Sequence, residues 1–125
     1  MRKELIISVV IGAAMMLLTG CAGKDGPGAH ADIKGKKITV ASGDFFEACD
    51  KWEPGDKVNF SFTSSKPVMF NVHYHEKHGK FYAIKDQMID KLDSSFIVQS
   101  KNIHCCFWKN NNDKYVTITY DMSVE

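Results

Sequence analysis

Three histidines, a glutamate and a methionine fall within the eleven-residue segment VMFNVHYHEKH, which runs from Val68 to His78. Imidazole nitrogens, carboxylate oxygens and thioether sulfurs are all ligands for metal ions. His73 and His75 are two residues apart, so in an extended strand they project from the same face with their Cβ atoms about 6–7 Å apart. At that spacing both imidazoles can reach one ion. The segment therefore predicts a metal site built on a His-x-His strand.

Two imidazoles do not complete such a site, because zinc sites in proteins use three or four protein ligands. The candidates for the remaining positions near this strand are Glu76, His78 and Met69. A more distant candidate is His104 together with one of the cysteines that follow it. Imidazole with thioether or thiol sulfur suits copper, whereas imidazole with carboxylate suits zinc. The sequence leaves both metals open as the cofactor.

Two other interpretations fit the same strand. One is a solvated sheet face on which the histidines bind nothing. The other is an interaction surface for an envelope protein, with polar and aromatic contacts from Asn71, His73, Tyr74 and Trp108. Catalysis is disfavoured, because the chain has no Gly-x-Ser-x-Gly, no Cys-x-x-Cys, no phosphate-binding glycine loop and no His-Glu-x-x-His motif. We therefore predict a binding protein and not an enzyme.

The elements that must position the histidines are strands. From Lys37 onward, short runs rich in β-branched and aromatic residues are separated by turn-forming residues such as Ser64–Pro67. Helical spacing is limited to the brief segment Asp86–Leu92. Strands that recur without a long helix between them predict an all-β fold, an antiparallel β-sandwich of about seven or eight short strands.

Alternation within the histidine strand separates its two faces. Large apolar residues occupy every second position and are expected to face the core; they are Val68, Phe70, Val72 and Tyr74. The opposite face, which we expect to lie in solvent, carries Met69, Asn71, His73 and His75.

The N-terminus predicts export and lipid anchoring. Arg2 and Lys3 precede an apolar run from Leu5 to Leu18, and a helix of that length reaches about 21 Å, short of the roughly 30 Å hydrocarbon layer. The run ends in Leu-Thr-Gly-Cys at Cys21, which is similar to the bacterial lipobox. Residues 1–20 are therefore expected to be a lipoprotein signal peptide, and acyl chains on Cys21 to anchor the protein. The alanine that follows favours the periplasmic face of the outer membrane.

The mature chain divides into a tether and one domain. Residues 21–36 carry four glycines, a proline and scattered charges, which predicts a flexible tether. Residues 37–125 are then expected to form the β-sandwich domain. Removing residues 1–20 takes two of the 16 basic and one of the 15 acidic residues and leaves 14 of each. This balance gives no support for nucleic acid as a partner.

A family resemblance covers about Phe45 to Met122. The segment FFEACDKWEPGDKVNFSFTSSKPVMFNVHYH, followed later by CCFWKNNNDKYVTITYDM, resembles the pattern of GOLD domains, which are known from cargo receptors of vesicular transport. The chain is also similar to small bacterial secreted proteins with an FN(I/V)HYHE strand, which are largely uncharacterised. The resemblance implies a GOLD-like or jelly-roll-like β-sandwich. It also implies a disulfide between Cys49 and Cys106.

The cysteine count leaves one thiol unpaired. Lipidation of Cys21 leaves Cys49, Cys105 and Cys106 in an oxidising compartment. Adjacent strand residues point to opposite faces, so Cys105 and Cys106 cannot both reach Cys49. The alternatives to the pairing that the resemblance implies are a Cys49–Cys105 bridge and no bridge at all. The remaining thiol is either a small buried apolar group or a soft metal ligand.

Overall fold

Every regular element that the computed structural model describes, over residues 31–125, is a β-strand. In chain order the strands are β1 (Ile33–Val40), β2 (Phe45–Asp50), β3 (Lys57–Glu76), β4 (Gly79–Ile97), β5 (His104–Lys109) and β6 (Val116–Val124). The expected signal peptide and the lipidation site Cys21 lie outside the described residues. Across residues 31–125, no helical segment has the length and apolar character needed to cross a bilayer.

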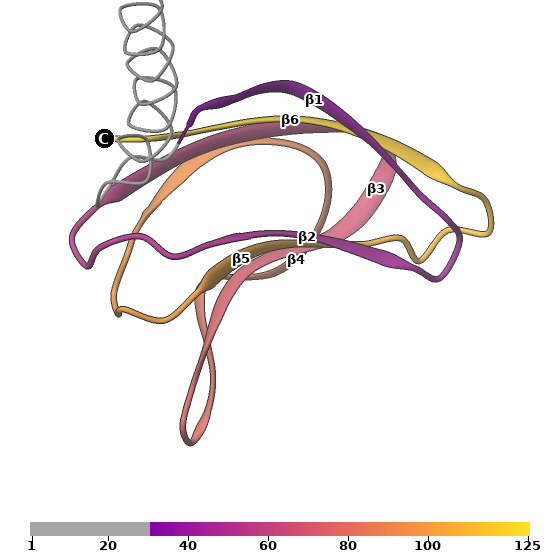
Figure 1. Ribbon diagram of the computed structural model, residues 1–125. Coiled ribbons are helices and arrows are strands. Elements are labelled where there is room, and N and C mark those ends of the chain that lie inside the picture. Colours follow the sequence, from indigo (N-terminus) through magenta and orange to yellow (C-terminus); the bar gives the residue numbers. More distant parts are fainter. Residues whose placement is uncertain (1–30) are drawn as a thin grey trace, which may run out of the picture.

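The strands form one curled antiparallel sheet of order β1-β6-β3-β5-β2, with β4 paired to β3. The first part of β3 pairs with β6 and the last part pairs with β5. Because β3 passes from one layer to the other, β1 and β6 arch over β2 and β5 (Figure 1). The turn between β3 and β4 projects away from the arch. The predicted fold class, an antiparallel β-sandwich, is confirmed.

Aromatic side chains from both layers fill the space between them. Trp108 of β5 is 1% exposed. It packs against Phe46, Phe62, Phe70 and Tyr120, with ring centroids 5.1 to 6.0 Å away. Burying each large apolar side chain stabilises the fold by about 1.5–3 kcal/mol. The inward face predicted for the histidine strand is confirmed, since its four apolar residues are all buried.

The strand count was predicted too high, because two expected breaks lie inside long strands. The predicted turn at Ser64–Pro67 is part of β3, which has 20 residues. Its register with β4 shifts between Thr63 and Val68, where the strand passes between the layers. Such irregularities bend a strand without ending it. The segment Asp86–Leu92 also belongs to a strand, the 19-residue β4, and there are six strands in the described chain.

The domain begins earlier than predicted. The expected tether reached residue 36, but Ile33 already pairs with Met122 and Lys36 with Tyr120 in β6. The register shifts between Ile33 and Lys36, and Gly35 adopts a φ of 59° there, a backbone conformation that glycine tolerates best. The Gly35 amide donates to Asp121 Oδ1 at 2.6 Å. Residues 33–36 are therefore part of the sheet.

Candidate metal site on the outer face

One layer is formed by β2, β5, the last part of β3 and the first part of β4, and its outer face points away from the core. Strand register aligns Cys49, Cys105, His73 and Tyr82 in one row across the four strands. Because side chains on one strand alternate between faces, Glu47 lies on the same face, one row away. This face places side chains from distant parts of the chain beside the predicted histidines.

His73 and His75 project from this face together, as the alternation predicts. Their ring centroids are 5.2 Å apart and their planes are nearly perpendicular, at 84°. The expectation that both lie in solvent is wrong for His73, which is 2% exposed, whereas His75 is exposed. Rings of Phe107 and Tyr82 flank His73 at 5.8 and 6.4 Å. These neighbours on β5 and β4 bury an imidazole that a single strand would leave open.

A hydrogen-bond chain determines which nitrogen of His73 carries a proton. The Asp86 carboxylate only accepts, so Asn71 must direct its Nδ2 toward Asp86 Oδ1, at 2.8 Å. The Asn71 oxygen then faces His73 Nδ1 at 2.7 Å. An amide oxygen also only accepts, so Nδ1 carries a hydrogen and donates it. In neutral His73 the lone pair is therefore on Nε2.

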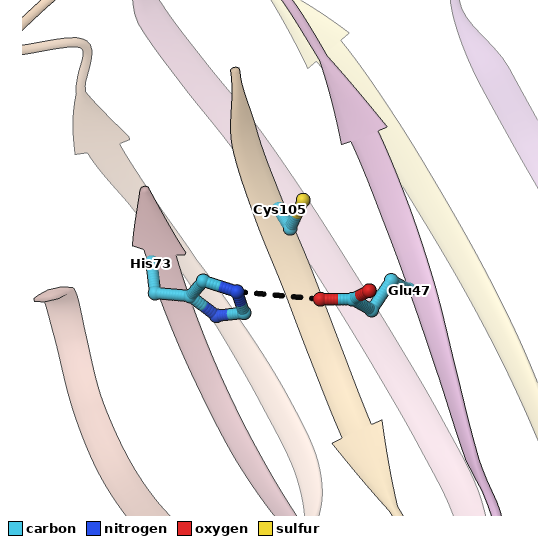
Figure 2. Close-up of side chains that lie close together, drawn as sticks. All are labelled: Glu47, His73 and Cys105. Atoms are coloured by element: carbon cyan, nitrogen blue, oxygen red, sulfur yellow. Dashed lines mark ion pairs between the residues drawn. The ribbon is translucent and has the colours of Figure 1, made fainter. Parts of the chain in front are cut away.

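That lone pair meets the carboxylate of Glu47. His73 Nε2 and Glu47 Oε2 are 3.3 Å apart, and Figure 2 shows the two side chains pointing toward each other across β5. Burial, followed by the Lys80 ammonium, lowers the pKa of His73, and the Glu47 carboxylate only partly opposes this. With His73 neutral, its Nε2 and the Glu47 oxygen are both hydrogen-bond acceptors, and neither has a hydrogen to donate to the other. A cation between the two atoms resolves that conflict.

The separation of the two acceptors matches that of ligands on one zinc ion. Zn–N and Zn–O bonds of about 2.0–2.2 Å at tetrahedral angles place a nitrogen and an oxygen ligand about 3.4 Å apart. The observed distance is 3.3 Å. Metal-binding histidines donate their other ring N–H to an acceptor that orients the ring; here Asn71 accepts from His73 Nδ1 and is itself held by Asp86.

The disulfide joins Cys49 to Cys105, and the predicted Cys49–Cys106 bridge is wrong. Cys49 and Cys105 are register partners on β2 and β5, with Cα atoms 4.0 Å apart. Closing a loop of 56 residues stabilises the fold by about 4 kcal/mol in the chain-entropy model. Cys106 points to the opposite face and is fully buried as a free thiol. Burial raises the pKa of Cys106 to about 12.

The other predicted ligands do not reach His73. Met69 lies four residues along β3, about 13 Å away by strand rise, and pairs with Met88. Glu76 and His78 are exposed at the β3–β4 turn. Within residues 31–125, one set of three His, Cys, Asp or Glu residues has ligand atoms all within 4.8 Å of one another, and it consists of Glu47, His73 and Cys105.

His104 is also excluded from this site, because it faces the core. It is fully buried, its ring stacks on Tyr74 at 4.4 Å, and its Nδ1 donates to the Asn102 carbonyl at 2.8 Å. Tyr74 and Trp108 are buried in the same core, so they cannot serve as the predicted contacts for a partner. The exposed apolar residues of the outer face are instead Phe45, Tyr82 and Met88.

Glu47 was missed because no local pattern connects it to the histidines, 26 residues further along the chain. The signal that would have found it is the cysteine register. Pairing of Cys49 with Cys105 puts Glu47 on the face of β5 that carries Cys105, and the register of His73 with Cys105 puts His73 on that same face.

The sandwich has counterparts among solved structures. This chain aligns over 74% of its length with 86% of the Yersinia pseudotuberculosis-derived mitogen, at 15% identity and a TM-score of 0.56. Two others have lower scores. A CBM4 structure aligns over 82% of this chain and 99% of its own, at 11% identity and a TM-score of 0.47. A de novo designed double-stranded β-helix aligns over 77% of this chain and 100% of its own, at 14% identity and a TM-score of 0.40. No family model and no curated protein matches the chain. The likeness to the mitogen supports the fold alone.

Proposed function

We propose that this protein is a lipid-anchored periplasmic binding module that takes up a zinc ion on the outer face of its sandwich. The ion lies between His73 Nε2 and the Glu47 carboxylate, with His75 as the third ligand. The observation that carries the proposal is the buried Nε2 of His73, held 3.3 Å from a carboxylate oxygen of Glu47. The anchor rests on the sequence of residues 1–21.

Zinc suits this set of donors better than copper. Imidazole and carboxylate ligands favour zinc, whereas the predicted copper site needed a sulfur ligand. Met69 lies too far along β3, and the Cys105 sulfur is bonded to Cys49. The exposed ring of His75 is close enough to turn toward the ion, since its centroid is 5.2 Å from that of His73. Water completes the tetrahedral shell. The site is therefore open on its solvent side and suited to binding and release.

Zinc uptake by the full chain, purified in detergent with its disulfide intact, tests the proposal. Equilibrium dialysis is expected to give about one equivalent per chain. Glu47→Gln and His75→Ala are expected to weaken binding by roughly 10- to 100-fold, the range in which even supporting groups of metal sites act. His78→Ala is the matched control, because it removes an exposed imidazole outside the site. Equal zinc binding by wild type, Glu47→Gln and His75→Ala contradicts the proposal.

A second candidate function, docking of an envelope protein, is favoured by exposed apolar residues on the same outer face. Phe45 and Met88 are 53% and 58% exposed, and Phe45 packs on Phe107 with centroids 5.3 Å apart. Exposed aromatic and methionine side chains are typical anchors of protein interfaces. Partner capture that is unchanged by a chelator and lost in Phe45→Ser supports docking without metal. Capture that disappears with the chelator supports the metal site.

A further inference from the structure

The proposed zinc site has one more ligand within reach, and a disulfide masks it. The Sγ of Cys105 lies within 4.8 Å of the nearest ligand atoms of both His73 and Glu47. In Figure 2 it stands on β5 beside the line that joins them. Its valence is taken by the bond to Cys49. A disulfide sulfur carries no charge, whereas a thiolate is one of the strongest ligands for zinc.

We propose that reduction of the Cys49–Cys105 disulfide by a dithiol converts this site into a tighter zinc site, in which the Cys105 thiolate joins His73 and Glu47. The inference rests on the proposed function and adds to it one further ligand and regulation of zinc affinity by the redox state of the disulfide. Zn–S and Zn–N bonds of about 2.3 and 2.0 Å place sulfur and nitrogen about 3.5 Å apart on a tetrahedral ion. Since the three ligand atoms lie within 4.8 Å of one another, they need to approach by no more than about 1.3 Å.

The exposure of the two cysteines determines which sulfur the reductant attacks in the thiol–disulfide exchange. Cys49 is exposed and Cys105 is 8% exposed, so a thiolate of the reductant attacks Cys49 Sγ. A mixed disulfide forms with Cys49, and Cys105 leaves as a thiolate beside His73. The second thiol of the dithiol then attacks its own mixed disulfide and releases Cys49 as a thiol. The dithiol loses two electrons and the protein disulfide gains them. Zinc binds the Cys105 thiolate in place of a proton.

Two single variants separate the roles of the sulfurs. Cys49→Ser and Cys105→Ser both lose the disulfide and leave one thiol at the site. Cys49→Ser keeps Cys105, so it is expected to bind zinc tightly with or without reductant. Cys105→Ser is expected to bind no more tightly than the oxidised wild type. Cys106 does not take part, because it faces the core and is fully buried.

The experiment measures zinc affinity of the full chain in detergent by competition with a chelator. Oxidised protein is compared with protein reduced by a dithiol and separated from it without oxygen. We expect reduction to tighten binding about 100-fold, the upper range by which single groups affect metal sites. By linkage, saturating zinc then raises the reduction potential of the disulfide by about 59 mV. Cobalt in place of zinc is expected to show a thiolate charge-transfer band in reduced wild type and Cys49→Ser.

The outcomes distinguish this inference from the function on which it rests. Equal affinity in both redox states, with no thiolate band, overturns the inference and leaves the His73–Glu47 site in place. Tight binding by Cys105→Ser but not by Cys49→Ser also overturns it, because the ligand is then Cys49. Absence of zinc uptake in both states removes the proposed function and the inference together.

Discussion

The substitution Glu47→Gln is expected to stabilise the metal-free protein while it weakens zinc binding. In the metal-free state, the lone pair of His73 Nε2 faces Glu47 Oε2 at 3.3 Å, and the two acceptors gain nothing from each other. A glutamine of the same shape turns its amide toward Nε2 and donates. The same change removes the anionic ligand of the ion.

The size of the gain in stability depends on how exposed the side chains of His73 and Glu47 are. A neutral hydrogen bond contributes about 0.5–1.5 kcal/mol to the free energy of unfolding. The His73 side chain is 3% exposed but that of Glu47 is 33% exposed, so the lower end, about 0.5 kcal/mol, applies. For a domain of this size, that raises the unfolding midpoint by about 2–4 °C.

Thermal unfolding in a chelator at pH 7.5 measures this effect. Glu53→Gln is the control, because Glu53 is exposed in the turn before β3 and its substitution removes the same charge away from the site. The control is expected to leave the midpoint unchanged. A lower midpoint for Glu47→Gln refutes the reasoning, since it means that His73 is protonated and forms an ion pair with Glu47.

Three further predictions follow from the same geometry. Because the pKa of His73 is lowered from 6.5, the unfolded chain takes up a proton at this position at a higher pH than the folded chain does. The free energy of unfolding of the metal-free protein is therefore expected to fall as the pH drops below 6.5. Urea titrations at pH 7.5 and 5.5 are expected to show a smaller fall for His73→Gln than for the control His78→Gln. The Cys106 thiol, with its pKa of about 12, is expected to resist alkylation at pH 8 until denaturant is added, and rapid labelling of the native protein contradicts its burial. Trp108→Ala is expected to lower the free energy of unfolding by about 3–5 kcal/mol in urea titrations, because the Trp108 ring contacts both layers. A loss below 1 kcal/mol contradicts a central role of Trp108 in the core.

Local alternation predicted more of the fold than of the site. The period of two along β3 correctly separated the buried Val68, Phe70, Val72 and Tyr74 from the face that carries His73. It did not show that the strand continues past Pro67, because prolines and serines are common to turns and to bends within a strand. Burial of His73 was also missed, since its covering rings come from β4 and β5.

The sequence by itself determined which residues of β3 share a face, because side-chain direction along a strand depends on neighbours in the chain. Only the tertiary structure decided that Glu47, His73 and Cys105 meet and that Cys49 pairs with Cys105. These residues come from three strands, and a shift of one residue between β2 and β5 would turn Glu47 to the other face. Register between distant strands depends on how the whole core packs, and no short segment of the chain carries that information.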